Sequence, residues 1–134
     1  MLKKVLSGFI LLLLCINLSA CSGNSGKDTV EHLSDTKFQQ SVLESKGIVF
    51  VDFFATWCPP CRAQGPIVEK LSTKMSDVKF YKLDVDQAKD TAAKYNVRSI
   101  PTLIVFKDGK EVSRVTGLSQ EDDIKKQIED AKTK

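Results

Sequence analysis

The sequence is poor in histidine and cysteine, the usual ligands of a structural zinc ion. Its 134 residues include one histidine, His32, and four cysteines. Cys15 and Cys21 belong to an N-terminal segment described below, which leaves Cys58, Cys61 and the distant His32. A structural zinc site needs four protein ligands. The composition therefore argues against a zinc site, and we expect neither a metal nor another cofactor.

The sequence also has little excess charge of either sign. It contains 20 lysines and arginines against 17 aspartates and glutamates, a formal net charge of +3. If residues 1–20 are removed, Lys3 and Lys4 are lost and the net charge falls to +1. Such a balance offers no electrostatic basis for binding nucleic acid. The sequence shows no internal repeat, and we expect a single folded domain and a monomer.

One long apolar run is present, and it lies at the N-terminus. Met1–Lys4 is short and basic, and Val5–Leu18 is almost wholly apolar. This pattern is typical of a bacterial secretory signal peptide, and the run is shorter than the ~20 residues of a transmembrane helix. A buried N-terminal helix is the alternative, which the lysine pair and the polar residues after Cys21 disfavour. We expect residues 1–20 to be a signal peptide.

The end of this segment, Leu18-Ser19-Ala20-Cys21, resembles the bacterial lipobox, whose cysteine is lipidated and becomes the first residue after cleavage. The resemblance implies a lipid on Cys21 that anchors the protein to a membrane of the bacterial cell envelope, facing outside the cytoplasm. Ordinary cleavage near Ala20, without lipid, is the alternative. Residues 21–28 are rich in glycine and serine, so we expect a flexible tether there.

Regular patterns begin at about Thr29 and predict an α/β domain over residues 29–134. Ser34 or Asp35 is placed to cap a first helix, which Gly47 ends. Residues 48–54 are β-branched and aromatic without alternation, which is typical of a strand buried on both sides. Three further strands are expected over residues 78–85, 102–106 and 111–116. A second helix is marked by Ile67, Leu71 and Met75, with Pro66 inside it, and a short third helix is expected over residues 91–95. A last helix is marked by Ile124, Ile128 and Ala131, with Ser119 as its cap. Their order predicts a mixed β-sheet with helices on both faces.

A pair of cysteines stands between the first apolar strand and the helix that contains Pro66. The segment reads Trp57-Cys58-Pro59-Pro60-Cys61, and the strand before it ends in Val51-Asp52-Phe53-Phe54-Ala55. Ile100-Pro101-Thr102, Phe106-Lys107-Asp108-Gly109 and Gly117 follow further along the chain. With these segments the domain resembles the thioredoxin family over residues 29–132, which implies the thioredoxin fold and a Cys58–Cys61 pair that forms a redox-active disulfide. Phe54 departs from the tryptophan that thioredoxins usually have there.

The expected position of Cys58 favours an ionised sulfur. At the start of a helix its Sγ faces unpaired backbone amides and the positive end of the helix dipole, and both stabilise a thiolate, the attacking species in disulfide exchange. Pro59 and Pro60 carry no N–H, which leaves the amide of Cys61 as the nearest donor. We expect Cys58 to attack a substrate disulfide and Cys61, deeper and shielded, to resolve the mixed disulfide. Thioredoxins usually have glycine at Pro59, and we expect the stiffer loop to change the redox potential.

The family resemblance implies a proton acceptor behind this pair. Asp52 matches a buried carboxyl with a raised pKa, which takes the proton from Cys61 during resolution. Lys82, in the neighbouring strand, matches the lysine that accompanies this acid. The alternatives are that Asp52 lies at a strand end in solvent and that Lys82 is an ordinary exposed lysine.

The resemblance also implies a substrate-binding rim. Pro101 matches a cis-proline that lies against the dithiol and leaves the Ile100 backbone free to pair with an extended substrate segment. A trans proline that merely begins a strand is the alternative. Trp57, Pro59, Pro60 and Gly117 complete the rim. The alternative for Trp57 is a position in the hydrophobic core.

From the resemblance we expect a reductase of disulfides in exported proteins, supplied with electrons by a membrane partner. A thiol oxidant, an isomerase, and a non-catalytic peptide-binding or chaperone module are the alternatives. The short segment Asp84–Thr91 has no room for the insertions that specialised oxidases and cytochrome-maturation reductases of this superfamily carry. A purely structural disulfide is disfavoured, because closing so short a loop gains little entropy.

Overall fold

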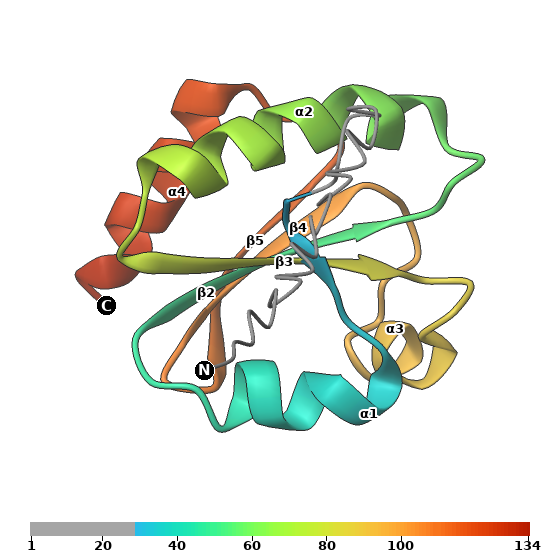
Figure 1. Ribbon diagram of the computed structural model, residues 1–134, viewed down its shortest axis with the longest axis horizontal. Coiled ribbons are helices and arrows are strands. Elements are labelled where there is room, and N and C mark those ends of the chain that lie inside the picture. The colour runs from blue at the N-terminus through green and yellow to red at the C-terminus, as the bar shows by residue number, and fades with distance from the viewer. Residues whose placement is uncertain (1–28) are drawn as a thin grey trace, which may run out of the picture.

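The structure is a computed structural model, and it describes residues 29–134. The expected signal peptide, Cys21 and the tether lie outside the described residues. Within residues 29–134, five strands form one sheet in the order β1-β3-β2-β4-β5 (Figure 1). The strands are β1 (Glu31–His32), β2 (Ile48–Phe54), β3 (Val78–Asp84), β4 (Thr102–Lys107) and β5 (Lys110–Thr116). β1 and β2 run parallel to β3, whereas β4 is antiparallel to both β2 and β5.

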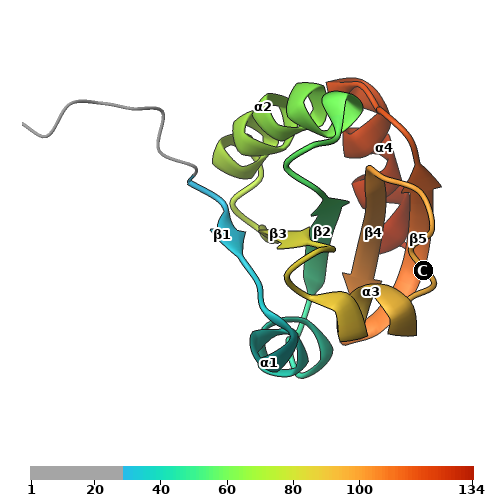
Figure 2. The same ribbon diagram turned by 90° about the vertical axis from the view of Figure 1, so that its right-hand side faces the viewer.

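Helices cover both faces of this sheet. They are α1 (Asp35–Phe38), which continues into the π-helix η1 (Gln39–Leu43), α2 (Pro59–Lys74), α3 (Lys89–Lys94) and α4 (Glu121–Lys132). α2 and α4 lie on one face, and α1 and α3 lie on the other (Figure 2). The predicted fold class and order of elements are confirmed. No helix in residues 29–134 is long and apolar enough to span a bilayer.

Strand β2 is buried along nearly its whole length, as its apolar sequence predicts. Successive side chains of a strand point to opposite faces of the sheet. Val49, Val51 and Phe53 pack in the cluster that includes residues of α1 and η1, and Phe50 packs in the cluster that includes residues of α2 and α4. By this alternation Asp52 shares the face of Phe50. The carboxyl therefore lies in the layer between the sheet and α2.

Two helix starts differ from the sequence prediction. α3 begins at Lys89 rather than Thr91, because the Asp35 carboxylate caps it from another element: Asp35 Oδ1 accepts the Thr91 N–H at 2.8 Å. α4 has Gln120 rather than Ser119 at its N-cap, without a side-chain cap bond. Ser119 is engaged elsewhere, because its backbone pairs with a side chain of α2.

The turn between β4 and β5 consists of Asp108 and Gly109, with positive φ angles of 50° and 79°. This is the conformation that an Asp-Gly hairpin requires. A Cβ on Gly109 would lie 2.0 Å from the carbonyl oxygen of Leu43. The turn therefore packs directly on the end of η1, and glycine is needed both for the backbone angle and for the close approach.

The two edges of the sheet are of different kinds. β1 contains two residues. β5 is longer, and its exposed side chains include Lys110, Glu111 and Arg114. Arg114 and Glu111 form an ion pair with a shortest distance of 2.8 Å.

Candidate active site

Cys58 and Cys61 form a disulfide at the point where the chain passes from β2 into α2. Their Cα atoms lie 5.2 Å apart, within the usual range for a disulfide. Cys58 is the N-cap residue of α2, and its backbone is extended, with φ −86° and ψ 112°. The first sulfur therefore lies at the beginning of a 16-residue helix.

One backbone amide points at the sulfur of Cys58. The Cys61 N–H donates to Cys58 Sγ at 3.3 Å, and Pro59 and Pro60 at the first two helical positions have no N–H to donate. Exposure does not distinguish the two sulfurs in this state, because Cys58 is 2% exposed and Cys61 is 4% exposed. The expectation that Cys61 is shielded is therefore confirmed for the disulfide form, but Cys58 is shielded to the same degree. What sets Cys58 apart is its place at the helix N-cap.

A cis peptide bond lies beside the disulfide. It joins Ile100 to Pro101, and Cys58 Sγ lies 3.7 Å from the carbonyl oxygen of Ile100. Within residues 29–134 the Ile100 N–H has no hydrogen-bond partner. Pro101 is buried, and its carbonyl oxygen accepts the Gly117 N–H at 2.8 Å. The three segments around residues 58, 101 and 117 therefore meet at one place.

The surface around the disulfide is formed by exposed residues. Pro59 and Pro60 are exposed, Gly117 is half-exposed, and Trp57 has 65% of its surface in solvent. The alternative of a core position for Trp57 is therefore wrong. The structure brings Trp57, Ile100 and Gly117 together around the cysteines, although they come from three separate connections between elements.

Asp52 and Lys82 are neighbours on adjacent parallel strands, paired in register on β2 and β3. Asp52 is 1% exposed and Lys82 is 6% exposed, so both alternatives that placed them in solvent are wrong. Burial raises the pKa of the Asp52 carboxyl to about 7, and the Lys82 ammonium partly opposes this rise. Oδ1 of Asp52 has no hydrogen-bond partner among the described residues. A carboxyl in this setting exchanges its proton near neutral pH.

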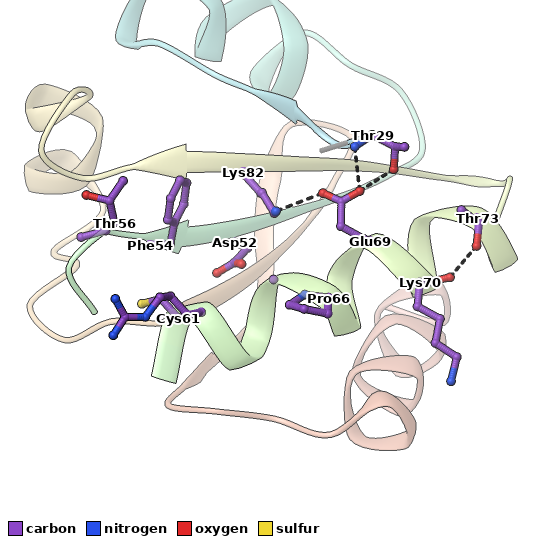
Figure 3. Close-up of a pocket in the computed structure, with 13 residues that line it drawn as sticks. Thr29, Asp52, Phe54, Thr56, Cys61, Pro66, Glu69, Lys70, Thr73 and Lys82 are labelled. Atoms are coloured by element: carbon purple, nitrogen blue, oxygen red, sulfur yellow. Dashed lines mark hydrogen bonds and ion pairs between the residues drawn. The ribbon is translucent and has the colours of Figure 1, made fainter. Parts of the chain in front are cut away.

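Glu69 of α2 is a member of this cluster that the sequence did not indicate. Its Oε1 lies 3.0 Å from the Lys82 Nζ, and its Oε2 accepts the Thr29 N–H at 2.9 Å (Figure 3). Burial raises the pKa of Glu69, but the hydrogen bonds from Thr29 and Lys82 outweigh this effect, and the net pKa is lowered. Lys82 therefore lies near two carboxyl groups, that of Glu69, whose pKa is lowered, and that of Asp52, whose pKa is raised.

A cavity of about 680 Å³ opens beside this cluster, between α2 and strands β2 and β3. Asp52, Cys61 and Lys82 all line it, and Figure 3 shows the Asp52 carboxyl between the Lys82 side chain and α2. Its other lining residues are Thr29, Phe54, Ala55, Thr56, Arg62, Gly65, Pro66, Glu69, Lys70 and Thr73. Within residues 29–134 no cluster of three or more potential metal ligands occurs. Asp52, whose carboxyl exchanges its proton near neutral pH, and Cys61, the second cysteine of the pair, therefore line the same cavity.

A disulfide that follows a buried strand, lies at the N-terminus of a helix and is next to a cis-proline defines a thiol–disulfide oxidoreductase. The Thioredoxin family model matches residues 29–130. The chain belongs to the thioredoxin family.

Individual relatives agree with this assignment. The chain is 49% identical over 84 residues to Thioredoxin-2 of Saccharomyces cerevisiae, covering 63% of this chain and 81% of the relative. It is 43% identical over 99 residues to Thioredoxin of Chlamydia trachomatis, covering 74% of this chain and 95% of the relative. Among solved structures, one from work on the thiol resolving mechanism in yeast mitochondrial 1-Cys peroxiredoxin via glutathione/thioredoxin systems matches with a TM-score of 0.70 and 31% identity. That match covers 76% of this chain and 95% of the other.

Proposed function

We propose that the protein is an exported, lipid-anchored reductase of protein disulfides. The observation that carries the proposal is the Cys58–Cys61 disulfide at the N-cap of α2, with the Cys61 N–H directed at Cys58 Sγ. The same amide stabilises a thiolate on Cys58 once the disulfide is reduced. The disulfide form described here is the product state of the proposed reaction.

The first step is attack by the Cys58 thiolate on a sulfur of the substrate disulfide. A mixed disulfide forms between Cys58 and the substrate, the substrate S–S bond breaks, and one substrate thiolate leaves. The segment around the attacked sulfur lies along residues 100–101, where the unpartnered Ile100 N–H is available to an extended chain. Trp57, Pro59, Pro60 and Gly117 are further residues of this docking rim.

The second step is resolution by Cys61. Its thiol gives a proton to the Asp52 carboxylate, and the resulting thiolate attacks Cys58 Sγ. The mixed disulfide breaks, the second substrate thiolate leaves, and the Cys58–Cys61 disulfide forms. Two electrons have passed to the substrate, so a dithiol donor must reduce the protein again. A pKa of about 7 suits Asp52 for this role, because both protonation states are accessible near neutral pH, and Lys82 beside it limits the rise.

The cellular setting of the proposal rests on the N-terminal sequence. The signal peptide over residues 1–20 and the lipid on Cys21 place the domain outside the cytoplasm on the surface of a membrane, attached through residues 21–28. A membrane protein that carries a dithiol is then the electron donor. A Cys21→Ser variant is expected in the soluble fraction, whereas the unchanged protein is expected in the membrane fraction; fractionation that finds both soluble would refute the anchor.

Reduction of insulin by dithiothreitol tests the activity. We expect the domain to accelerate the reaction and Cys58→Ser to abolish the acceleration, while a Cys61→Ala variant accumulates as a mixed disulfide with its substrate. An inactive intact domain would instead support a module that only binds peptides. Alkylation of the protein in cells tests the direction of electron flow: a reductase is found mainly as the dithiol, and an oxidant mainly as the disulfide.

A further inference from the structure

A buried glutamine joins helix α2 to the connection between β5 and α4. Gln64 lies three residues after Cys61 in α2, nearly one full helical turn, and none of its surface is exposed. Its Oε1 accepts the Ser119 N–H at 2.8 Å, and its Nε2 donates to the Ser119 carbonyl oxygen at 3.2 Å. One side-chain amide therefore pairs with both backbone groups of a single residue.

The connection that Gln64 holds is also attached to the cis-proline segment. The Gly117 N–H donates to the Pro101 carbonyl oxygen at 2.8 Å. Residues 117–119 are thus fixed at one end to the residue beside the disulfide and at the other end to the helix that the disulfide begins. Figure 2 shows this connection passing beside α2 before α4 begins. Leu118, between the two attachments, is 45% exposed, one of the few large apolar side chains so exposed in residues 29–134.

An apolar residue at position 64 would fill the same space but would not hold the loop. Ser119 is 8% exposed, and its N–H and carbonyl would lose their partners while remaining nearly buried, which is unfavourable. The loop would move to rehydrate these groups. The path of residues 117–119 across this face therefore depends on the amide of Gln64 and not on its volume alone.

We propose that Gln64 is a positioning residue for substrate binding. By holding Ser119, it presents Leu118 as an apolar wall of the docking rim, where it contacts the substrate residues next to the attacked cysteine. The inference rests on the proposed reductase activity and adds to it a preference for protein disulfides flanked by apolar residues. Gln64 does not touch the reacting sulfurs, so its loss affects substrate binding and leaves the sulfur chemistry unchanged.

The test compares Gln64→Met with the matched variant Gln127→Met. Gln127 is also a nearly buried glutamine on a helix, and its amide donates to the Leu103 carbonyl oxygen at 3.4 Å rather than to Ser119. We expect Gln64→Met to raise the KM for insulin on the order of tenfold, the effect of losing one or two buried hydrogen bonds, with kcat little changed. Its single-turnover rate with the small disulfide 5,5′-dithiobis(2-nitrobenzoic acid) should stay within about twofold of the unchanged domain. Gln127→Met should leave all three quantities near the values of the unchanged domain.

A second variant keeps the inference testable if Gln64→Met does not fold. Leu118→Ala alters an exposed side chain and is expected to raise the KM for insulin in the same direction. An unchanged insulin KM in either folded variant, or an equal loss with both disulfides, would overturn the positioning role. Failure of the proposed function looks different, because the unchanged domain would then not accelerate insulin reduction, and no KM could be compared between variants.

Discussion

The indole N–H of Trp57 donates to Asp86 Oδ2 at 2.8 Å. This bond joins the residue before Cys58 to the connection between β3 and α3, 29 positions further along the chain. Because Trp57 is 65% exposed, packing alone holds its ring weakly. The hydrogen bond to Asp86 therefore fixes an exposed aromatic ring next to the disulfide.

We expect an Asp86→Ala variant to release this ring. The second-order rate of insulin reduction should fall about twofold to fivefold, as expected for the loss of one hydrogen bond. The free energy of unfolding should change by no more than about 0.5 kcal/mol, because Asp86 is exposed. Asp86→Asn retains an oxygen acceptor and serves as the control. If Asp86→Asn loses as much activity as Asp86→Ala, the carboxylate charge and not the hydrogen bond is responsible.

The buried carboxyl of Asp52 should lower the stability of the folded protein at neutral pH. Its pKa rises from 3.8 to about 7 on burial, so between these values the folded state keeps a proton that the unfolded state releases. The free energy of unfolding therefore decreases as pH rises from about 4 to about 7. An Asp52→Asn variant lacks this titration and should be more stable above pH 7 by at most ~4 kcal/mol.

Urea denaturation at pH 4 and pH 8 measures this effect. The increase in the free energy of unfolding caused by Asp52→Asn should be large at pH 8 and small at pH 4. At pH 4 the carboxyl is protonated in the folded state and in a large fraction of the unfolded molecules. An equal gain at both pH values would show that the asparagine improves packing or hydrogen bonding, and would remove the support for a raised pKa.

Pro60 should limit the ionisation of Cys58 in the reduced protein. An N-cap side chain accepts hydrogen bonds from the second or third helical N–H, and here the second position is Pro60, which has none. Pro60→Ala adds that donor. In a Cys61→Ser background, where a single thiol near the helix start titrates, the thiolate absorbance at pH 6 should rise on the order of tenfold.

Pro59→Ala is the matched control, because the first helical N–H does not reach the N-cap side chain. It removes a proline from the same turn without adding a donor to Cys58. Equal thiolate absorbance in both alanine variants would mean that loop stiffness, and not the missing amide, governs the ionisation of Cys58.

Gly109 should be far less tolerant of alanine than Gly47. Both have positive φ, 79° and 80°, so both substitutions impose a backbone strain of roughly 1–2 kcal/mol. At Gly109 the new Cβ would also lie 2.0 Å from the Leu43 carbonyl oxygen, whereas at Gly47 nothing lies within 4 Å. Urea denaturation should show a markedly larger loss for Gly109→Ala. Equal losses would mean that the β4–β5 turn moves freely away from η1.

The regular elements could be predicted because local pattern and burial agree. Strand β2 is apolar on both faces and lies in the middle of the sheet, and Asp108 and Gly109 form the predicted turn. The beginning of α3 could not be predicted, since it is capped by Asp35, 56 positions away from Thr91. In α2 the predicted helix is marked by Ile67, Leu71 and Met75; Leu71 and Met75 are buried, but Ile67 is only half-buried, and Val68 beside it is fully buried.

The site could be predicted where a motif carries it. The cysteine pair, Pro101 and the strand positions of Asp52 and Lys82 follow from local sequence together with the family resemblance. Local sequence does not indicate Glu69, Gln64 and Asp86, because each acts through a contact with a residue distant in the chain. Gln64 had one visible signal: it lies four positions before Val68, on the buried face of α2, where a polar side chain needs a partner.

The edges of the sheet have a consequence for how copies of this chain meet. β1 is too short to template another strand, and β5 surrounds its open backbone groups with lysine, glutamate and arginine. Neither edge is a long, flat, apolar ladder of the kind that recruits a neighbouring molecule. We therefore expect that, even when many copies are crowded together, the folded edges of residues 29–134 disfavour strand-to-strand pairing between molecules.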